Sequence, residues 1–274
     1  MVTPILLYGS EVWGCEAVTM LDKFQIQFCK QILKLKQCAP SCMVYGDLGI
    51  MPVSLLIKMR VLNYWCKVIN CKDSKINNIL YRTAFSLYEK SDVKLPWLRF
   101  VHDTLNSIGL TYIWNQQCFG SNTIFKNLIK RKLQDQYLQS WNSKMNESAK
   151  CLNYRLYKQS FEFENYLDIL PMHLAKFLCK FRCCNHKLPI EEGRFFGIDR
   201  ADRICNLCNM NVLGDEFHYL LQCRFFDVER KKYIQPYFFT HTNVLKFYEL
   251  MNTKDYNLLV KLSIFCKKNV SAFP

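Results

Sequence analysis

The sequence is poor in the residues that interrupt regular structure. Its 274 residues include only 9 glycines and 8 prolines, beside 20 phenylalanines and 15 tyrosines. This balance argues against long linkers, collagen-like repeats and low-complexity segments. Half of the residues are hydrophobic and 22% are charged, so we expect a sizeable core built as one large or two small domains.

Membrane-spanning and targeting segments are also missing from the sequence. No window approaches the ~18 uncharged apolar residues that a transmembrane helix needs. The first residues, MVTPILLYGSEVWG, have no basic stretch and too short an apolar run for a signal peptide. We therefore expect an intracellular protein, in the nucleus or the cytoplasm, without a membrane partner. Its 15 cysteines are then expected to be reduced.

Common catalytic motifs are absent too. The sequence has no nucleotide-binding glycine loop, no nucleophile elbow and no H-E-x-x-H helix. Glu191 and Glu192 are adjacent acids, and neighbours on a chain seldom point at the same atom. Cys183 and His186 imitate a thiol–imidazole pair, but nothing supplies a third, orienting group. The sequence predicts no catalytic residue.

What the chain has in excess is positive charge, with 37 Lys+Arg against 23 Asp+Glu and a net charge of +14. A polyanionic partner is the natural inference, and RNA or DNA comes before a membrane. A protein of high pI without such a partner is the alternative. Residues 121–146 predict the most basic helix, where Tyr137 and Trp141 lie among the cations. That pattern suits single-stranded nucleic acid, and equally a helix that packs its aromatics inward.

Hydrophobic periodicity predicts a mainly α fold. Apolar residues at helical spacing indicate helices over 19–35, 53–70, 76–90, 96–110 and 121–146. Thr19 is the expected N-cap of the first helix, and Pro96 lies in the first turn of the fourth. Residues 5–8 predict a short N-terminal strand. The expected architecture is a multi-helix assembly with that strand and a small zinc-stapled module near the carboxyl end.

The module is predicted from the spacing C-x2-C-x9-H-x4-C in one 19-residue window. The four residues are Cys205, Cys208, His218 and Cys223. Two cysteines separated by two residues can bind one ion from a tight turn, and Asp215 is a plausible N-cap for a short helix that presents the histidine. Residues five apart on an α-helix point ~140° apart, so the last cysteine must lie at or beyond the helix end. Three thiolates and one imidazole make a closed, structural zinc site.

Buried free thiols are the alternative to a zinc site in a chain with this many cysteines. A rival ligand set also exists in CKFRCCNH, which offers Cys179, Cys183, Cys184 and His186. Cys183 and Cys184 are adjacent, which is awkward for two ligands of one ion.

The segment that leads into the module, 171–203, is moderately basic. It carries seven Lys and Arg against four Asp and Glu, so a solvated face competes with a phosphate-binding one. The candidates for contacts to nucleic-acid phosphates are Arg182, His186, Arg194, Arg200 and Arg203.

Two stretches resemble one known family. TPILLYGSEVWG, at 3–14, is similar to the segment that follows the catalytic domain in reverse transcriptases of non-LTR, LINE-like retrotransposons. The run from 181 to 223 resembles the carboxy-terminal region of the same polyproteins, where an Arg-rich lead-in precedes a three-Cys, one-His zinc site. The matching positions are Arg182, His186, Leu188, Pro189, Gly193, Arg203 and the four predicted ligands.

The resemblance implies a carboxy-terminal, non-catalytic fragment that contacts the RNA or DNA backbone. The aspartate pair of a polymerase palm is missing from this chain, so the fragment is expected to be no enzyme on its own, and the polymerase core of a parent element is a further partner. The implied segments are 1–75 after the polymerase core, 76–165 as a helical linker region, 166–235 as lead-in and zinc module, and 236–274 as a helical tail. A zinc-stabilised protein-interaction module without nucleic-acid binding is the alternative function.

Overall fold

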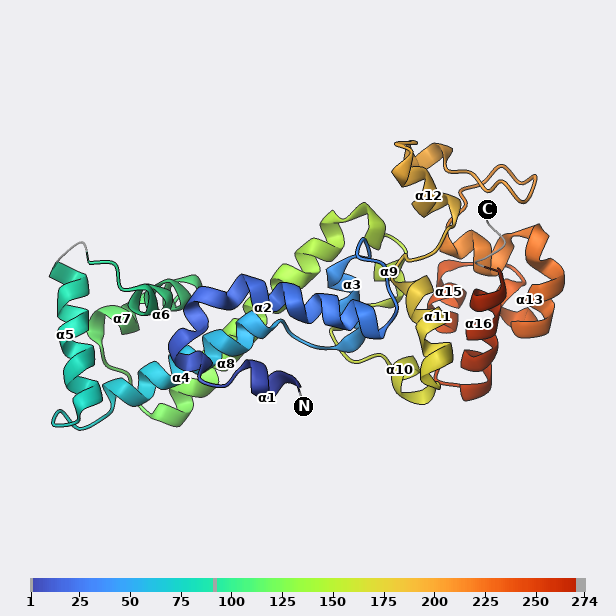
Figure 1. The fold of residues 1–274 in the computed structure, drawn as a ribbon. Helices are drawn as coiled ribbons and strands as arrows, with labels where there is room; N and C mark the ends of the chain where they lie inside the picture. The colour runs from blue at the N-terminus through green and yellow to red at the C-terminus, as the bar shows by residue number, and fades with distance from the viewer. Residues whose placement is uncertain (1, 91–92, 270–274) are drawn as a thin grey trace. The chain divides into compact units, whose positions relative to one another are not determined.

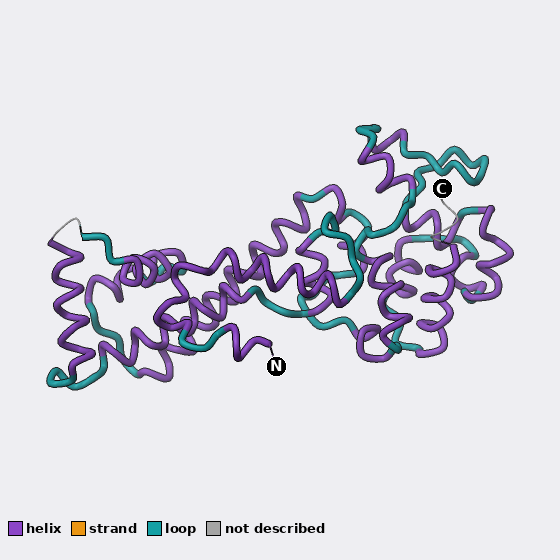
Figure 2. Tube along the Cα trace, in the orientation of Figure 1, coloured by secondary structure: helices purple, strands orange, loops and turns teal. Residues whose placement is uncertain are grey.

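The protein is mainly helical in the part of the chain that the structure, a computed structural model, describes, which is residues 2–90 and 93–269 (Figures 1 and 2). These residues contain no strand. One isolated antiparallel bridge joins Ile204 and Leu213. The mainly α prediction is confirmed.

The predicted N-terminal strand is wrong, because helix α1 covers Val2–Leu6 and α2 covers Ser10–Ile32. A short apolar run cannot separate a strand from a buried helical turn by periodicity alone. Helix α2 also begins nine residues before the expected cap, Thr19, which lies inside it. Lys30 of this helix is 5% exposed, and its Nζ donates to the carbonyl of Gln37 over 2.8 Å.

The chain packs as two compact units, and both are discontinuous in sequence. The first unit comprises residues 1–25 and 51–141, and the second comprises 26–50 and 142–274. The boundaries fall inside α2, between residues 50 and 51, and inside α8 (Asn122–Glu147). The four consecutive segments implied by the resemblance remain an expectation about how the sequence is organised. The helices themselves pack into two units that do not follow those segments.

The first unit is built around one aromatic and aliphatic core. Besides α1 and the start of α2, its helices are α4 (Val53–Ile69), α5 (Ile76–Lys90), α6 (Pro96–Ser107), α7 (Thr111–Gln116) and most of α8 (Asn122–Glu147). Trp65 of α4 is fully buried, and its indole donates to the hydroxyl of Tyr81 over 2.8 Å. Its ring stacks on Trp114 with centroids 6.3 Å apart. The helices predicted over 53–70, 76–90 and 121–146 agree with α4, α5 and α8 within two residues.

The second unit contains the candidate site and is made of many short helices. These are α3 (Ser41–Leu48), η1 (Ala149–Cys151), α9 (Tyr154–Tyr157), α10 (Asn165–Ile169), α11 (Met172–Arg182), α12 (Pro189–Phe195), η2 (Arg200–Asp202), η3 (His218–Gln222), η4 (Arg224–Phe226), α13 (Asp227–Tyr233), α14 (Pro236–Phe239), α15 (Val244–Met251) and α16 (Tyr256–Asn269). Helix α16 packs against α11 and α13, and α15 packs against α9 (Figure 1).

A buried ion pair lies at the centre of the second unit. Arg182 and Asp47 have fully buried side chains, and Nε of the arginine lies 3.0 Å from Oδ2 of the aspartate. Glu164 accepts from the same guanidinium over 2.9 Å, and the hydroxyls of Tyr154 and Tyr166 donate to the Asp47 carboxylate over 2.6 and 2.7 Å. A buried charge is tolerated only when it is paired and hydrogen-bonded in this way. The prediction that Arg182 contacts phosphate is wrong, because its charge is used inside the core.

Among the described residues, no single helix is long and apolar enough to cross a membrane. Helices α3 and α4 reach that length and composition only when they are taken together across the bend between them.

Candidate metal centre

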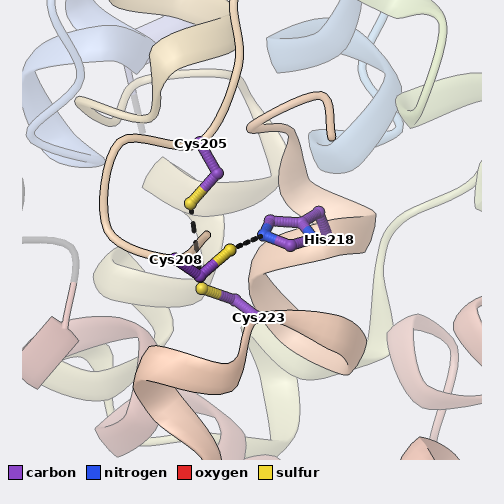
Figure 3. Close-up of side chains that lie close together, drawn as sticks. All are labelled: Cys205, Cys208, His218 and Cys223. Carbon is purple, nitrogen blue, oxygen red and sulfur yellow. Dashed lines mark hydrogen bonds between the residues drawn. The ribbon is translucent and has the colours of Figure 1, made fainter. Parts of the chain in front are cut away.

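The four predicted ligands converge on one point (Figure 3). Their ligand atoms all lie within 4.8 Å of one another. The Sγ atoms of Cys205 and Cys223 are 3.8 Å apart, and Sγ of Cys208 lies 3.3 Å from Nε2 of His218. A tetrahedron with metal–sulfur bonds near 2.3 Å and metal–nitrogen bonds near 2.0–2.1 Å has sulfur–sulfur edges of about 3.8 Å and sulfur–nitrogen edges of about 3.6 Å. The geometry therefore fits a single metal ion.

The first two ligands come from a segment that doubles back on itself. The backbone N–H of Cys205 donates to the carbonyl of Val212 over 2.9 Å. The backbone N–H of Gly214 donates to the backbone carbonyl of Arg203, also over 2.9 Å. Asn211 takes a left-handed conformation, with φ of 55°, in the return of this turn. Asparagine tolerates that conformation better than most residues. The turn brings Cys208 back beside Cys205.

The other two ligands flank one turn of helix. Asp215 caps it as predicted, because its Oδ1 accepts from the backbone N–H of His218 over 2.9 Å. The following turn, η3, is a π-helix, and the N–H of Cys223 donates to the carbonyl of His218 over 2.8 Å. This i→i+5 bond is the defining bond of a π-helix, a form that is frequent at functional sites. Cys223 follows the helix end, as the spacing required.

Arg230 holds this turn in place, and sequence reasoning did not find it. The residue is 2% exposed. Its guanidinium donates to the carbonyls of Leu220 (2.7 Å), Tyr219 (3.2 Å) and Cys223 (2.7 Å). Helix ends leave carbonyls without partners, and here one arginine satisfies three of them. It lies outside the ligand motif, so no spacing rule points to it.

Burial sets the protonation of the centre. Cys223 is fully buried and His218 is 3% exposed. Burial and the neighbouring thiols of Cys205 and Cys208 raise the pKa of Cys223 to about 12, while burial lowers the pKa of His218. The lowered pKa favours the neutral imidazole, which is the form that binds a metal. Three thiolates at this distance need a cation to offset their charge, and metal binding deprotonates such thiols.

The lead-in is fixed to the metal centre by Arg203. Its Nη1 donates to the carbonyl of Ile190 over 3.0 Å, and Nη2 donates to that of Ile198 over 2.7 Å. The side chain crosses α12 at Gly193, where a Cβ atom would lie 2.7 Å from Cγ of Arg203. Only glycine leaves room for this crossing. We assign Arg203 to the packing of the lead-in and not to phosphate binding.

His186 is also an internal residue, so its predicted phosphate contact is wrong. Its side chain is fully buried and Nε2 lies 2.9 Å from Oε1 of Glu216. Burial alone would raise the pKa of Glu216, but His186 and the amide of Asn153 lower it to about 2. The N–H of Leu188 donates to Nδ1 of His186 over 3.3 Å, so Nε2 carries the proton and donates to the carboxylate.

Two further groups of metal-ligating side chains occur in the second unit, and hydrogen bonds account for both. In Cys184, His186 and Glu216, the proton on Nε2 occupies the position that a metal would need. In Asp47, Cys179 and Cys183, both carboxylate oxygens already accept from arginine and tyrosine.

Arg194 and Arg200 are half-exposed, as Arg203 is. Arg194 donates to Glu191 over 3.1 Å.

Comparison with protein-family models, with curated proteins and with solved structures finds no match for this chain. Its function has to be inferred from its own residues.

Proposed function

We propose that this chain is the zinc-stapled, nucleic-acid-binding and non-catalytic carboxy-terminal region of a LINE-like reverse transcriptase. The donor set supports zinc, because three sulfurs and one imidazole at tetrahedral spacing are typical of structural zinc sites and leave no position open for water. The resemblance of 3–14 and 181–223 supports the family. The polymerase that the family implies is assigned to a parent polyprotein.

The observation that carries the nucleic-acid proposal is a lysine face on α11, α13 and α16. We define this face by Lys176, Lys180, Lys232, Lys267 and Lys268. Helix α16 packs against both other helices. The ammonium groups of Lys180 and Lys267 lie 5.8 and 5.3 Å from the centre of the same ring, Phe177. That of Lys268 lies 5.5 Å from the ring of Tyr233.

Acidic residues neutralise only part of this face. Helices α11 and α16 contain no Asp or Glu. On α13, Asp227 is paired with the buried Arg230, and Glu229 contacts Lys232 over 2.7 Å. Lysines held at neighbouring positions by packed helices suit the spaced negative charges of a phosphate backbone, which carries no sequence information. We therefore propose backbone contacts to RNA or DNA through the lysine face.

A salt series of filter-binding measurements tests this proposal. The triple variant Lys180→Gln, Lys267→Gln and Lys268→Gln is expected to weaken binding to unrelated sequences equally, and to reduce the slope of log K against log salt by up to about three units. Its matched control replaces Lys34, Lys187 and Lys254, which are exposed elsewhere in the same unit, and so removes the same net charge. Equal losses in the two triple variants would reject the lysine face as the binding site.

Exposed phenylalanines at the carboxyl end of α12 favour a second function, a protein-interaction module. Phe195 is 70% exposed and Phe196 is 75% exposed, which is unusual for adjacent large apolar residues. An interface built on them would change little with salt, unlike phosphate binding. Failure to bind RNA or DNA even at low salt, together with a salt-insensitive protein complex that is lost in Phe195→Ser with Phe196→Ser, would favour this alternative.

A primer-extension assay tests the non-catalytic part of the proposal. The sequence has no adjacent aspartate pair to hold two metal ions. Purified protein with magnesium is therefore expected to give no template-dependent synthesis. Synthesis that disappears when a residue of this chain is replaced would contradict the assignment.

A further inference from the structure

Two cysteines from distant parts of the sequence meet in the second unit. The Sγ atoms of Cys42 and Cys151 lie 3.7 Å apart, although the residues are 109 positions apart in the chain. Cys42 lies in the first turn of α3 and Cys151 ends the short helix η1. Cys151 is fully buried, whereas Cys42 is partly exposed. One sulfur of the pair is therefore accessible to a small reagent and the other is not.

The two sulfurs also differ in acidity. The hydrogen bond from the Cys151 thiol lowers the pKa of Cys42 to about 7, with help from the backbone N–H of Met43 and the charge of Lys144, and against the effect of burial. This lowered pKa favours the Cys42 thiolate. Thiolates, not thiols, react with electrophilic oxidants, and reactive cysteines are partly exposed and near positive groups.

Two other close thiol pairs lack this combination. Cys179 and Cys183 are both fully buried, and the pKa of Cys183 is raised by its hydrogen bond with Cys179 and by burial. Cys205 and Cys223 belong to the candidate metal centre, where a bound ion would protect them. Proximity, access and acidity coincide at Cys42 and Cys151.

We infer that Cys42 and Cys151 form a reversible disulfide when the protein meets a peroxide. The Cys42 thiolate attacks one peroxide oxygen and the O–O bond breaks. Hydroxide is the leaving group, and Cys42 becomes a sulfenic acid. The sulfur of Cys151 then attacks the Cys42 sulfur, the S–O bond breaks, and water leaves with the proton of Cys151. Each sulfur gives up one electron, the peroxide accepts two, and two molecules of water are formed in all.

The local geometry supports the second step. The two sulfurs need to approach by about 1.7 Å to reach the disulfide distance of about 2.05 Å. The pKa of Cys151 is raised first of all by its hydrogen bond to Cys42. Oxidation of Cys42 removes the negative charge that this bond stabilises, so the main cause of the raised pKa disappears when Cys151 has to react.

The disulfide would join residues 26–50 covalently to residues 142–274 inside one unit. Closing so long a loop restricts the unfolded chain more than the folded one. The oxidised protein is therefore expected to unfold several degrees higher than the reduced protein.

Peptide mapping of the full-length, zinc-loaded protein tests the inference. The protein is treated with a small molar excess of hydrogen peroxide, remaining thiols are blocked with N-ethylmaleimide, and trypsin is added without reductant. Cleavage after Lys and Arg places Cys42 in peptide 37–58 and Cys151 in peptide 151–155. A species that joins these two peptides, about 2 Da lighter than their sum and absent after dithiothreitol treatment, is the expected result.

Neighbouring cysteines provide the controls. Peptide 37–58 also contains the exposed Cys38, so Cys38→Ser should keep the cross-link and Cys42→Ser should abolish it. Cys179 and Cys183 should be recovered as thiols after unfolding. The inference is overturned if wild-type protein shows no joined peptides at a dose that oxidises Cys42, or if the cross-link survives in Cys42→Ser. The wild-type map needs no variant, so it stays decisive if a substituted protein fails to fold.

Discussion

Three arginines of the second unit donate to groups of the protein itself. Arg182 pairs with Asp47, Arg203 donates to carbonyls of the lead-in, and Arg230 donates to carbonyls around the last ligand. A guanidinium offers five donors in a fixed fork, which suits several backbone carbonyls at once. Positive residues beside a metal motif can thus be structural, and the phosphate-binding charge is proposed to lie on lysines.

The metal ligands provide the most direct prediction at this scale. Cys208→Ser is expected to reduce bound zinc from about one ion per chain to almost none, because a hydroxyl does not replace a thiolate in a closed site. Metal analysis by mass spectrometry of the purified protein measures this. Cys118→Ser, which changes an exposed cysteine of the first unit, should leave the zinc content unchanged. Undiminished zinc in Cys208→Ser would remove this residue from the ligand set.

A second prediction concerns Arg230. Arg230→Leu is expected to reduce the free energy of unfolding by about 3 kcal/mol, because three carbonyls lose their donor inside the protein. Arg230→Lys should lose less unfolding free energy, since an ammonium group can still donate to some of the three carbonyls. Urea unfolding of zinc-loaded protein measures both. Arg224→Leu, an exposed neighbour, should change stability by less than about 0.5 kcal/mol, and a similar loss there would mean that Arg230 has no special role.

At the scale of helices, local sequence signals predicted which helices form better than they predicted the conformation of short segments. Pro96 opens a helix as expected, because proline suits the first turn and no later one. Periodicity could not separate strand from helix over the few apolar residues at 5–8. It also could not show the π-helical turn η3, since only the tertiary fold and Arg230 stabilise that geometry. The burial of Arg182 depends on Asp47, 135 residues away, which no local pattern contains.

The end of α3 gives a prediction about a single glycine. Gly49 has φ of 57°, and a Cβ atom there would lie 2.4 Å from the backbone nitrogen of Phe163. Gly49→Ala should therefore cost about 3 kcal/mol of unfolding free energy or more, from backbone strain and a clash with rigid main chain. Gly109 has φ of 70° with nothing within 4 Å of such an atom, so Gly109→Ala should cost only about 1–2 kcal/mol. Chemical denaturation compares the two, and equal costs would mean that the contact with Phe163 is unimportant.

At the scale of the whole molecule, the sequence predicted the four ligands and their convergence but not the surface proposed to bind nucleic acid. Metal ligands sit in one short window with a fixed spacing, so the motif is complete in the sequence. The lysine face combines α11, α13 and α16, and the packing of α16 between the others places Lys180 and Lys267 beside one ring. Segments that are distant in sequence and meet only in the folded protein leave no periodic pattern in the sequence.

The link between the metal centre and the lysine face gives a prediction for the intact protein. Helix α13 follows Cys223 after one turn of 3-10 helix, and Arg230 of α13 donates to the Cys223 carbonyl over 2.7 Å. Removal of zinc with a chelator should therefore disturb α13 and lower nucleic-acid affinity by at least about tenfold, since metal binding and local folding are coupled. Filter binding before and after chelation measures this, and restored zinc should restore affinity. Unchanged affinity in metal-free protein would show that the lysine face is independent of the centre.

The pairing of Asp47 with Arg182 also has a consequence for the order of events on the ribosome. The aspartate is synthesised 135 residues before its partner. At about 5–20 residues per second, that is a delay of roughly 7–27 s. The first unit is fully synthesised once the chain reaches position 141. That unit can therefore fold while Asp47 is still in contact with water and has no arginine partner. A nascent chain stalled before position 182 is therefore expected to protect the first unit from protease and leave residues 26–50 open to cleavage.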